Sequence, residues 1–251
     1  MSVSSPYMPS PSPSRPDSPS SRADELSASP PLFASDALDR LTRVHPAVPL
    51  VLFGPMVGVL IVWALAAQAA GVAAISVLGG YALWTLTEYW LHRGVFHFEP
   101  EGGFALRVHY LIHGVHHDHP NDPRRLVMPP SASLPLAATF CLVFYVIAGD
   151  PGWRAVAAGF LTGYVVYDTL HYLVHHRVPT SRVGRSLRER HMRHHFQDDT
   201  RGYGVSAPYW DRLFGTAVRP RRAGASSARS DLTGRREAWA LRLSQSVYRR
   251  G

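Results

Sequence analysis

Long apolar stretches alternate with polar segments along the chain. Residues 49–70 carry no formal charge, and residues 72–91 are uncharged until Glu88, near their end. A run of about 20 apolar residues is long enough to cross the hydrocarbon core of a membrane as an α-helix. Gly71 allows a tight return, and no basic residue lies between the two stretches. The pattern therefore predicts a transmembrane helical hairpin.

A second hairpin is predicted further along. Residues 134–147 are apolar but short, and they reach spanning length only with the lead-in 127–133. The turn sequence GDPG at 149–152 then leads into a returning helix over 155–174. Arginines lie before and after the first hairpin, and they resume at Arg177 after the second, which places the two termini on the cytoplasmic side. The expected fold is all-α, with four transmembrane helices and a cytoplasmic helical cap.

The two ends of the chain differ from this apolar centre. Residues 1–33 are rich in Ser and Pro without apolar periodicity, which predicts a disordered tail. Residues 34–217 are expected to form one membrane domain, opening with a short helix over 34–44. Residues 218–251 form a basic tail. Its stretch 236–250 has an amphipathic pattern that suits either the surface of anionic lipid or a partly ordered tail.

The charge pattern agrees with a membrane protein. The formal net charge is +8, and all 26 basic residues are arginines. These arginines flank apolar segments and lie beside no aromatic nucleic-acid motif, so nucleic acid is not an expected partner. A lysine-free, arginine-rich chain favours a GC-rich bacterial genome and hence the inner membrane; in a eukaryote we expect the endoplasmic reticulum. The single cysteine, Cys141, excludes an intrachain disulfide and a zinc ribbon.

The histidines carry the candidate chemistry. Thirteen of the fourteen fall within residues 92–119 or 171–195. Neutral imidazole is a common ligand of iron, zinc and copper, and spacings of three and four residues on a helix aim several imidazoles at one ion. Ten histidines form the motifs HxxxxH, HxxHH, HxxxH and HxxHH in that order, and all but the first pair, which is five residues apart, have such spacings: His92, His97, His113, His116, His117, His171, His175, His191, His194 and His195. Ten ligands exceed the about four to six that one ion takes, so the pattern predicts two metal ions.

The remaining polar candidates are less specific. His109 lies one turn before His113 and is a possible eleventh site residue, whereas His45 is expected to be structural or interfacial. His119 and His176 are expected at a loop or a helix end. The carboxylates of Glu88 and Asp168 lie near His92 and His171 in the chain, where they could accept hydrogen bonds from ring N–H groups. Each could equally cap a helix or pair with an arginine.

The two HxxHH segments are not apolar enough to span, so we expect them on cytoplasmic helices. Ser186 and Glu189 have the spacing of a capping box, which predicts a helix running from there through His195. The earlier helix is expected to start near Phe104 and to stop before Pro120.

These residues resemble the fatty acid hydroxylase/sterol desaturase superfamily, whose four histidine motifs recur here in the same order between Glu88 and Thr216. The chain is most similar to the fatty acid 2-hydroxylases that act on sphingolipid acyl chains. The stretches that carry this similarity are EYWLHRGVFH, HYLIHGVHHDHPNDPRRLVMPP, GYVVYDTLHYLVHH, HMRHHF and GYGVSAPYWDRLFGT.

The resemblance implies O2-dependent hydroxylation at carbon 2 of a fatty acid or ceramide. It also implies two iron ions, which zinc could replace in the isolated protein. Eukaryotic 2-hydroxylases often carry a fused cytochrome b5 domain, and residues 1–31 cannot form one. The resemblance therefore implies a separate electron donor, cytochrome b5-like or ferredoxin-like, with a reductase.

Two other readings stay open at this point. A related oxygenase or desaturase could act on a carotenoid or sterol-type lipid, although residues 125–130 resemble the 2-hydroxylases specifically. A non-enzymatic membrane protein could bind zinc structurally. Structural zinc sites usually have four ligands, often including cysteine, so a site of ten histidines is a poor match for that reading.

Overall fold

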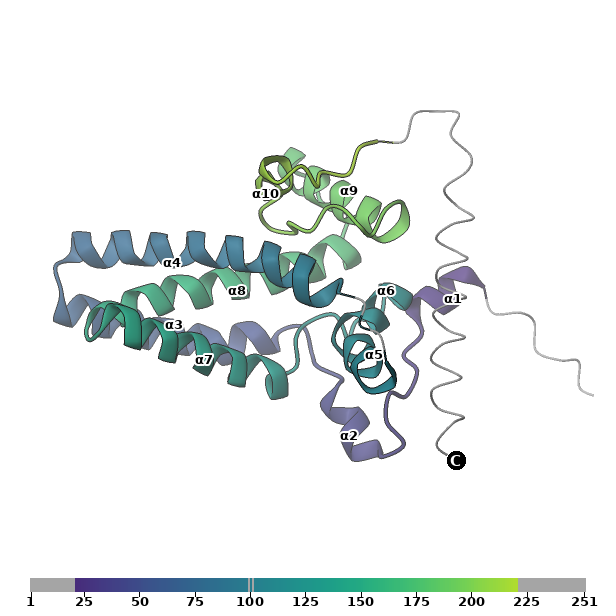
Figure 1. Cartoon of the computed structure of the whole chain (residues 1–251), viewed down its shortest axis with the longest axis horizontal. Helices are drawn as coiled ribbons and strands as arrows, with labels where there is room; N and C mark the ends of the chain where they lie inside the picture. The colour runs from purple at the N-terminus through teal and green to yellow at the C-terminus, as the bar shows by residue number, and fades with distance from the viewer. Residues whose placement is uncertain (1–20, 99, 101, 221–251) are drawn as a thin grey trace, which may run out of the picture.

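The computed structural model describes residues 21–98, 100 and 102–220, and every regular element in this part of the chain is helical. Four long helices lie side by side: α3 (Val48–Ala67), α4 (Ala70–Leu91), α7 (Pro130–Ala148) and α8 (Gly152–His176). The shorter helices gather at one end of this bundle (Figure 1). The bundle and the group of short helices correspond to the expected membrane part and cap.

Three of the long helices are long and apolar enough to cross a membrane. They cover Val48–Ala67, Ala70–Phe96 and Pro130–Ala148. Large apolar side chains on them face outward, with Ile75 73% and Ile147 79% exposed. Water would disfavour such a surface, whereas lipid is a suitable solvent for it. The protein is therefore a membrane protein.

The fourth long helix, α8, is the inner helix of the bundle. Thirteen of its 25 residues are buried, and it packs against α3, α4 and α7. Its aromatic side chains build much of the core: Phe160 lies edge-on to Trp84, with ring centroids 5.1 Å apart, and Tyr164 lies edge-on to Phe53 at the same distance. Because α8 is covered by its neighbours, it can carry polar residues at a depth where lipid would not tolerate them.

The turns at the far end of the bundle are short. Gln68 and Ala69 separate α3 from α4, so Gly71 lies within the first turn of α4 and is not the expected point of return. Gly149 ends α7 with a φ of 63°, a conformation that favours glycine, and the predicted turn before α8 is confirmed.

Two of the histidine-bearing segments contain a turn of π-helix. The π-helix η1 (His92–Phe96) continues α4 beyond its predicted end. The second segment consists of α5 (Gly103–His109), the π-helix η2 (Tyr110–Gly114) and α6 (Val115–Asp118). Its ends agree with the prediction, but its π-helical centre was not expected. A π-turn shifts the side chains that follow it around the helix axis, and such turns are frequent at functional sites.

The last histidine helix, α9 (Arg182–Phe196), begins four residues before the predicted capping box. Ser181 is its N-cap, and its hydroxyl accepts a hydrogen bond from Gly184 N at 3.0 Å. The expected capping box is therefore wrong: Ser186 lies inside the helix, where its hydroxyl accepts a hydrogen bond from Arg190 at 3.3 Å. The short helix α10 (Tyr209–Leu213) follows α9 and completes the cap.

The N-terminal region differs from the expected disordered tail over residues 21–33. Helix α1 (Arg22–Ser27) opens with a capping box between Ser21 and Asp24. Helix α2 (Asp36–Leu41) falls within the predicted short helix. Residues 1–20 and 221–251, which include the amphipathic stretch 236–250, lie outside the described residues.

Candidate dimetal centre

The ten histidines selected by their spacing gather in two groups at the cap end of the bundle. Within each group, one ring nitrogen from every member lies within 4.8 Å of those of the others. The first group consists of His92, His97, His113, His117 and His194. The second group consists of His116, His171, His175, His191 and His195.

Each HxxHH motif divides its histidines between the two groups. His113 and His117 belong to the first group, and His116 belongs to the second. Adjacent residues on a helix point about 100° apart, so neighbouring histidines can serve two different centres. The later motif divides the other way, with His194 in the first group and its two partners in the second. The two groups are thereby linked through both motifs.

The nitrogen separations in the first group have the size expected around a metal ion. Nε2 of His92 lies 3.2 Å from Nε2 of His97 and 3.2 Å from that of His113. Nε2 of His117 lies 3.0 Å from that of His113. Ligand nitrogens about 2.1 Å from one ion lie about 3.0–3.4 Å from each other. Nε2 of His194 is buried and has no hydrogen-bond partner among the residues that the structure describes, as expected of a nitrogen that binds an ion.

The second group has the same spacing. Nε2 of His116 lies 3.1 Å from Nε2 of both His171 and His195. Nε2 of His191 lies 2.8 Å from that of His175 and 3.1 Å from that of His195. The donor set in each group is imidazole alone, which suits a first-row transition metal. The residues present therefore fit two metal ions.

Hydrogen bonds from the outer ring nitrogens fix the orientation of two ligands. His92 donates through Nδ1 to the carbonyl of Tyr203 at 2.6 Å, and His194 donates through Nδ1 to that of Arg201 at 2.7 Å. These bonds place the proton on Nδ1 and leave the Nε2 lone pair free to bind metal. Asp211 in turn holds the loop, accepting hydrogen bonds from the backbone N–H of Tyr203 and Gly204 at 2.9 and 2.8 Å. Through Asp211, the WDRLFGT segment therefore supports the loop whose carbonyl orients His92.

The two candidate carboxylates have other partners than expected. Glu88 accepts hydrogen bonds from the backbone N–H of Ser206, at 2.8 Å, and from its hydroxyl. Asp168 accepts from Met128 N at 3.2 Å and from the Tyr164 hydroxyl at 3.0 Å. Neither carboxylate therefore accepts the hydrogen bond from a histidine ring N–H that the sequence suggested; both bind other groups. Glu88 instead holds the loop that carries the Tyr203 carbonyl.

Burial keeps the imidazoles of the cap in the neutral form that binds metals. It lowers the pKa of His116 to about 3 and that of His194 to about 4. Burial also lowers the pKa of His113 and His191 well below the usual value, with the neighbouring histidines adding to the effect. At neutral pH these rings carry no charge, so ten of them can stand together.

The other histidines lie outside the two groups. His109 donates through Nε2 to the carbonyl of Phe96 at 2.5 Å. Nδ1 of His119, which follows α6, bonds to the carbonyl of Glu25 at 2.7 Å, and His176 ends α8. His45 accepts a hydrogen bond from Ala47 N at 3.2 Å, just before α3. The structure gives His109, His119 and His45 local hydrogen bonds and places none of the four in either group.

A cavity of about 450 Å³ opens onto both groups of histidines, a feature that the sequence did not reveal. His113 of the first group and His116 and His171 of the second line it. Most of its other lining residues are apolar, and they include Leu91 of α4 and Leu136 of α7. A cavity of this size is typical of a small-molecule site. The arrangement can therefore hold an apolar chain beside two metal ions.

Comparison with known proteins places this arrangement in a family. The family model described as fatty acid hydroxylase matches residues 77–216, which contain all ten histidines. The chain belongs to the fatty acid hydroxylase family. The resemblance inferred from the sequence is thus confirmed.

Individual relatives agree with this placement. The chain is 37% identical over 188 residues to the dihydroceramide fatty acyl 2-hydroxylase FAH2 of Arabidopsis thaliana, covering 74% of this chain and 79% of that protein. It is 41% identical over 145 residues to the ceramide very long chain fatty acid hydroxylase SCS7 of Saccharomyces cerevisiae, covering 56% and 37% of the two chains. A solved structure of scs7p, in which only the hydroxylase domain is visible, superposes with a TM-score of 0.71 at 36% identity. That superposition covers 76% of this chain and 72% of that chain.

Proposed function

We propose that this family member is a membrane-bound, O2-dependent monooxygenase that hydroxylates carbon 2 of a lipid acyl chain, in a fatty acid or a ceramide. The observation that carries the proposal is the apolar cavity bounded by His113, His116 and His171. A cavity that is apolar along most of its wall and ends at both candidate metal sites suits a hydrocarbon chain. The names of the relatives support an acyl chain over a carotenoid or a sterol.

The ten histidines would hold two metal ions, with iron favoured and zinc able to replace it in the isolated protein. Iron, when bound, supplies O2 activation with electrons from a donor. The chain's own residues do the rest: the cavity walls hold the acyl chain beside the histidines and exclude water from it. The carbonyls of Tyr203 and Arg201 keep His92 and His194 in the binding tautomer.

The proposal includes a topology and a partner. The apolar surface of α3, α4 and α7, together with the length of α8, supports four membrane spans. The arginines that precede the first span and follow the last one support placing both termini in the cytoplasm. The membrane is the inner membrane in a bacterium or the endoplasmic reticulum in a eukaryote. A separate cytochrome b5-like or ferredoxin-like protein with its reductase would supply two electrons per turnover. We place the hydroxylase domain at residues 34–217, and residues 21–33 pack against it through hydrogen bonds to His119 and Arg125.

The test is lipid mass spectrometry of cells that express the gene and lack 2-hydroxylated lipids of their own. We expect lipids heavier by one oxygen, whose fragmentation places a hydroxyl at carbon 2 of the acyl chain. The His116→Ala variant should yield none, because it removes one ligand of the second group. The His45→Ala variant should behave as wild type.

Two outcomes would contradict the proposal. An oxygen on a ring or on the long-chain base would retain the oxygenase and reject the acyl substrate. A folded, metal-containing protein that yields no oxygenated lipid with several electron donors would reject the oxygenase and favour a metal-binding protein.

A further inference from the structure

The cavity has one wall that lies outside the family match. Residues 29–43, which we call the N-terminal strap, precede the matched region 77–216. Leu32, Phe33 and Thr42 of the strap line the cavity that opens onto the histidines. The strap is therefore part of the candidate substrate site, although the family comparison does not include it.

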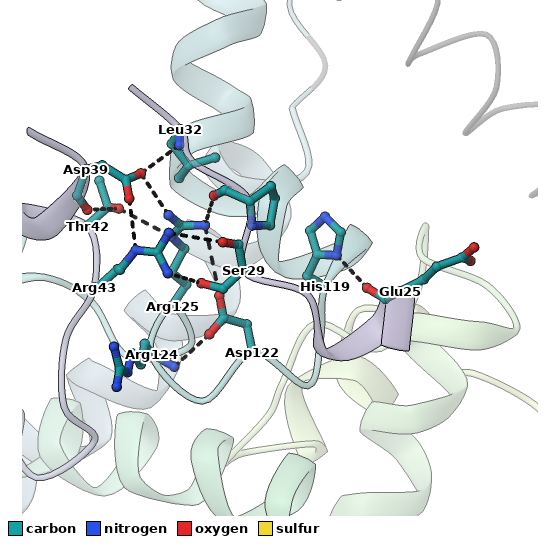
Figure 2. A network of polar contacts seen from close by, with 11 residues as sticks. Glu25, Ser29, Leu32, Asp39, Thr42, Arg43, His119, Asp122, Arg124 and Arg125 are labelled. Atoms are coloured by element: carbon teal, nitrogen blue, oxygen red, sulfur yellow. Dashed lines mark hydrogen bonds and ion pairs between the residues drawn. The ribbon is translucent and has the colours of Figure 1, made fainter. Parts of the chain in front are cut away.

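A buried ion pair fastens the strap to the metal-bearing cap. Nη2 of Arg125 lies 2.9 Å from Oδ1 of Asp39, and the two side chains are only 3% and 11% exposed. Arg125 also donates through Nη1 to the carbonyl of Pro30 and through Nε to the hydroxyl of Thr42 at 3.3 Å. Figure 2 shows this guanidinium surrounded by strap residues. Arg125 thus holds the strap against the cap through an ion pair and two hydrogen bonds.

Asp39 connects Arg125 to the residues of the strap that line the cavity. Its Oδ1 also accepts a hydrogen bond from Leu32 N at 2.7 Å, which fixes the backbone beside the two apolar lining residues. Its Oδ2 accepts from Arg43 Nε at 2.9 Å, and Arg43 binds the carbonyl of Ser29 at 3.0 Å (Figure 2). Both ends of the strap therefore depend on one carboxylate.

The strap lines the cavity from the cap end of the bundle, where its helix α2 lies (Figure 1). Leu91 and Leu136, which line the cavity, belong to the bundle helices α4 and α7. An acyl chain with its tail among these helices and carbon 2 at the histidines would direct its carbonyl toward the strap. The guanidinium nitrogens of Arg125 are already engaged by Asp39, Pro30 and Thr42, so the apolar side chains of Leu32 and Phe33 are left to meet the group on that carbonyl.

We propose that the strap is a specificity element, which limits the size of the group attached to the acyl carbonyl. This inference rests on the proposed 2-hydroxylation. Phe33 sets the position of the wall by its bulk, and the Asp39–Arg125 pair holds the wall in place. The cavity walls that the bundle helices contribute determine the accepted chain length.

The test compares two substrates with the same acyl chain, a free fatty acid and a dihydroceramide, using purified protein loaded with iron and supplied with an electron donor. The Phe33→Ala variant should shift the ratio of the two kcat/KM values by about tenfold toward the dihydroceramide, because it enlarges the head end of the cavity. The Asp39→Asn variant should shift the ratio in the same direction and speed tryptic cleavage at Arg40 and Arg43. Asp36→Asn is the matched control, since Asp36 is exposed on the same helix, and it should change neither.

Metal content and a series of acyl-chain lengths complete the experiment. Both variants should retain the wild-type metal content and the wild-type preference for chain length. An unchanged substrate ratio in Phe33→Ala overturns the proposal, as does faster cleavage of Asp39→Asn without a change in the ratio. A changed chain-length preference would place the strap at the tail end and would also overturn it. Failure of the wild type to hydroxylate either substrate would instead reject the proposed function.

Discussion

His194 illustrates how a single side chain is prepared to bind a metal ion. Its Nδ1 donates to the carbonyl of Arg201, and its Nε2 is buried with no partner among the described residues. Burial lowers its pKa to about 4, so the ring stays neutral at physiological pH. A neutral ring with one committed nitrogen has a single lone pair to offer, and that nitrogen belongs to the first group.

Removing one ligand from either group should lower the metal content. His194→Ala affects the first group and His116→Ala the second, so each variant should fall from about two bound ions per chain toward about one. Elemental analysis of purified protein by mass spectrometry measures this directly. His45→Ala should keep the full content, because His45 lies outside both groups. A fully loaded His194→Ala protein would remove that residue from the site.

Local spacing was enough to select the ten histidines that the structure brings together, because each motif lies within one short segment, and eight of the ten have i, i+3 or i+4 spacing on a helix. Spacing could not divide them between two groups, since that depends on how four separate segments meet. Spacing in the sequence also could not predict the hydrogen-bond partners of Glu88. Ser206 lies 118 residues away in the chain, and only the fold places it against that carboxylate.

At the scale of elements, two glycines allow α4 and α8 to cross closely. A Cβ atom at Gly80 would lie 2.1 Å from the carbonyl oxygen of Val156, and one at Gly159 would lie 1.9 Å from that of Val77. Small residues at a crossing let two membrane helices pack backbone to backbone. This crossing holds His92, at the end of α4, beside the helix that carries His171 and His175 of the second group.

Gly80→Ala should therefore destabilise the protein, by at least the about 1–3 kcal/mol typical of overpacking, because the added methyl meets backbone that cannot move aside. Gly79→Ala is a matched control one residue away, since its Cβ would meet nothing within 4 Å. It should be neutral or stabilising, as alanine favours a helix over glycine by about 1 kcal/mol. Thermal denaturation of both variants in detergent compares them. Equal Tm values would show that the helices can separate at no cost.

The elements differ in how far the sequence predicts them. The long apolar helices follow from length and composition alone, and their bounds agree with the structure to within a few residues. The π-turns η1 and η2 could not be predicted from the sequence, because five residues are too few for hydrophobic periodicity to distinguish a π-turn from an α-helix. The strap was predicted only in part. Its helix α2 falls within the expected helix 34–44, but residues 29–33 have the composition of a disordered tail. Contacts with Asp39 and Arg125 hold these residues, and local composition does not reveal them.

At the scale of the whole molecule, the bundle and the cap have different roles. The bundle presents apolar surface outward, and the cap gathers the histidines at one end (Figure 1). The cavity lies where the two meet, with walls from both. A lipid could enter such a site while its tail stays among apolar helices. This division requires that the ends of α4 and α8 reach the same face of the membrane.

The last prediction tests that requirement. Helix α8 has 25 residues and is about 37 Å long, enough to cross a hydrocarbon core of about 30 Å. We expect single cysteines at Asp36 and Val178, in a Cys141→Ser background, to react with an impermeant maleimide from the cytoplasmic side only. Cysteines at Ala69 and Asp150, in the two short turns, should react from the opposite side only. Labelling of positions 150 and 178 from the same side would show that α8 does not cross. The cap would then lie on both faces of the membrane, and the two histidine groups could not form as described.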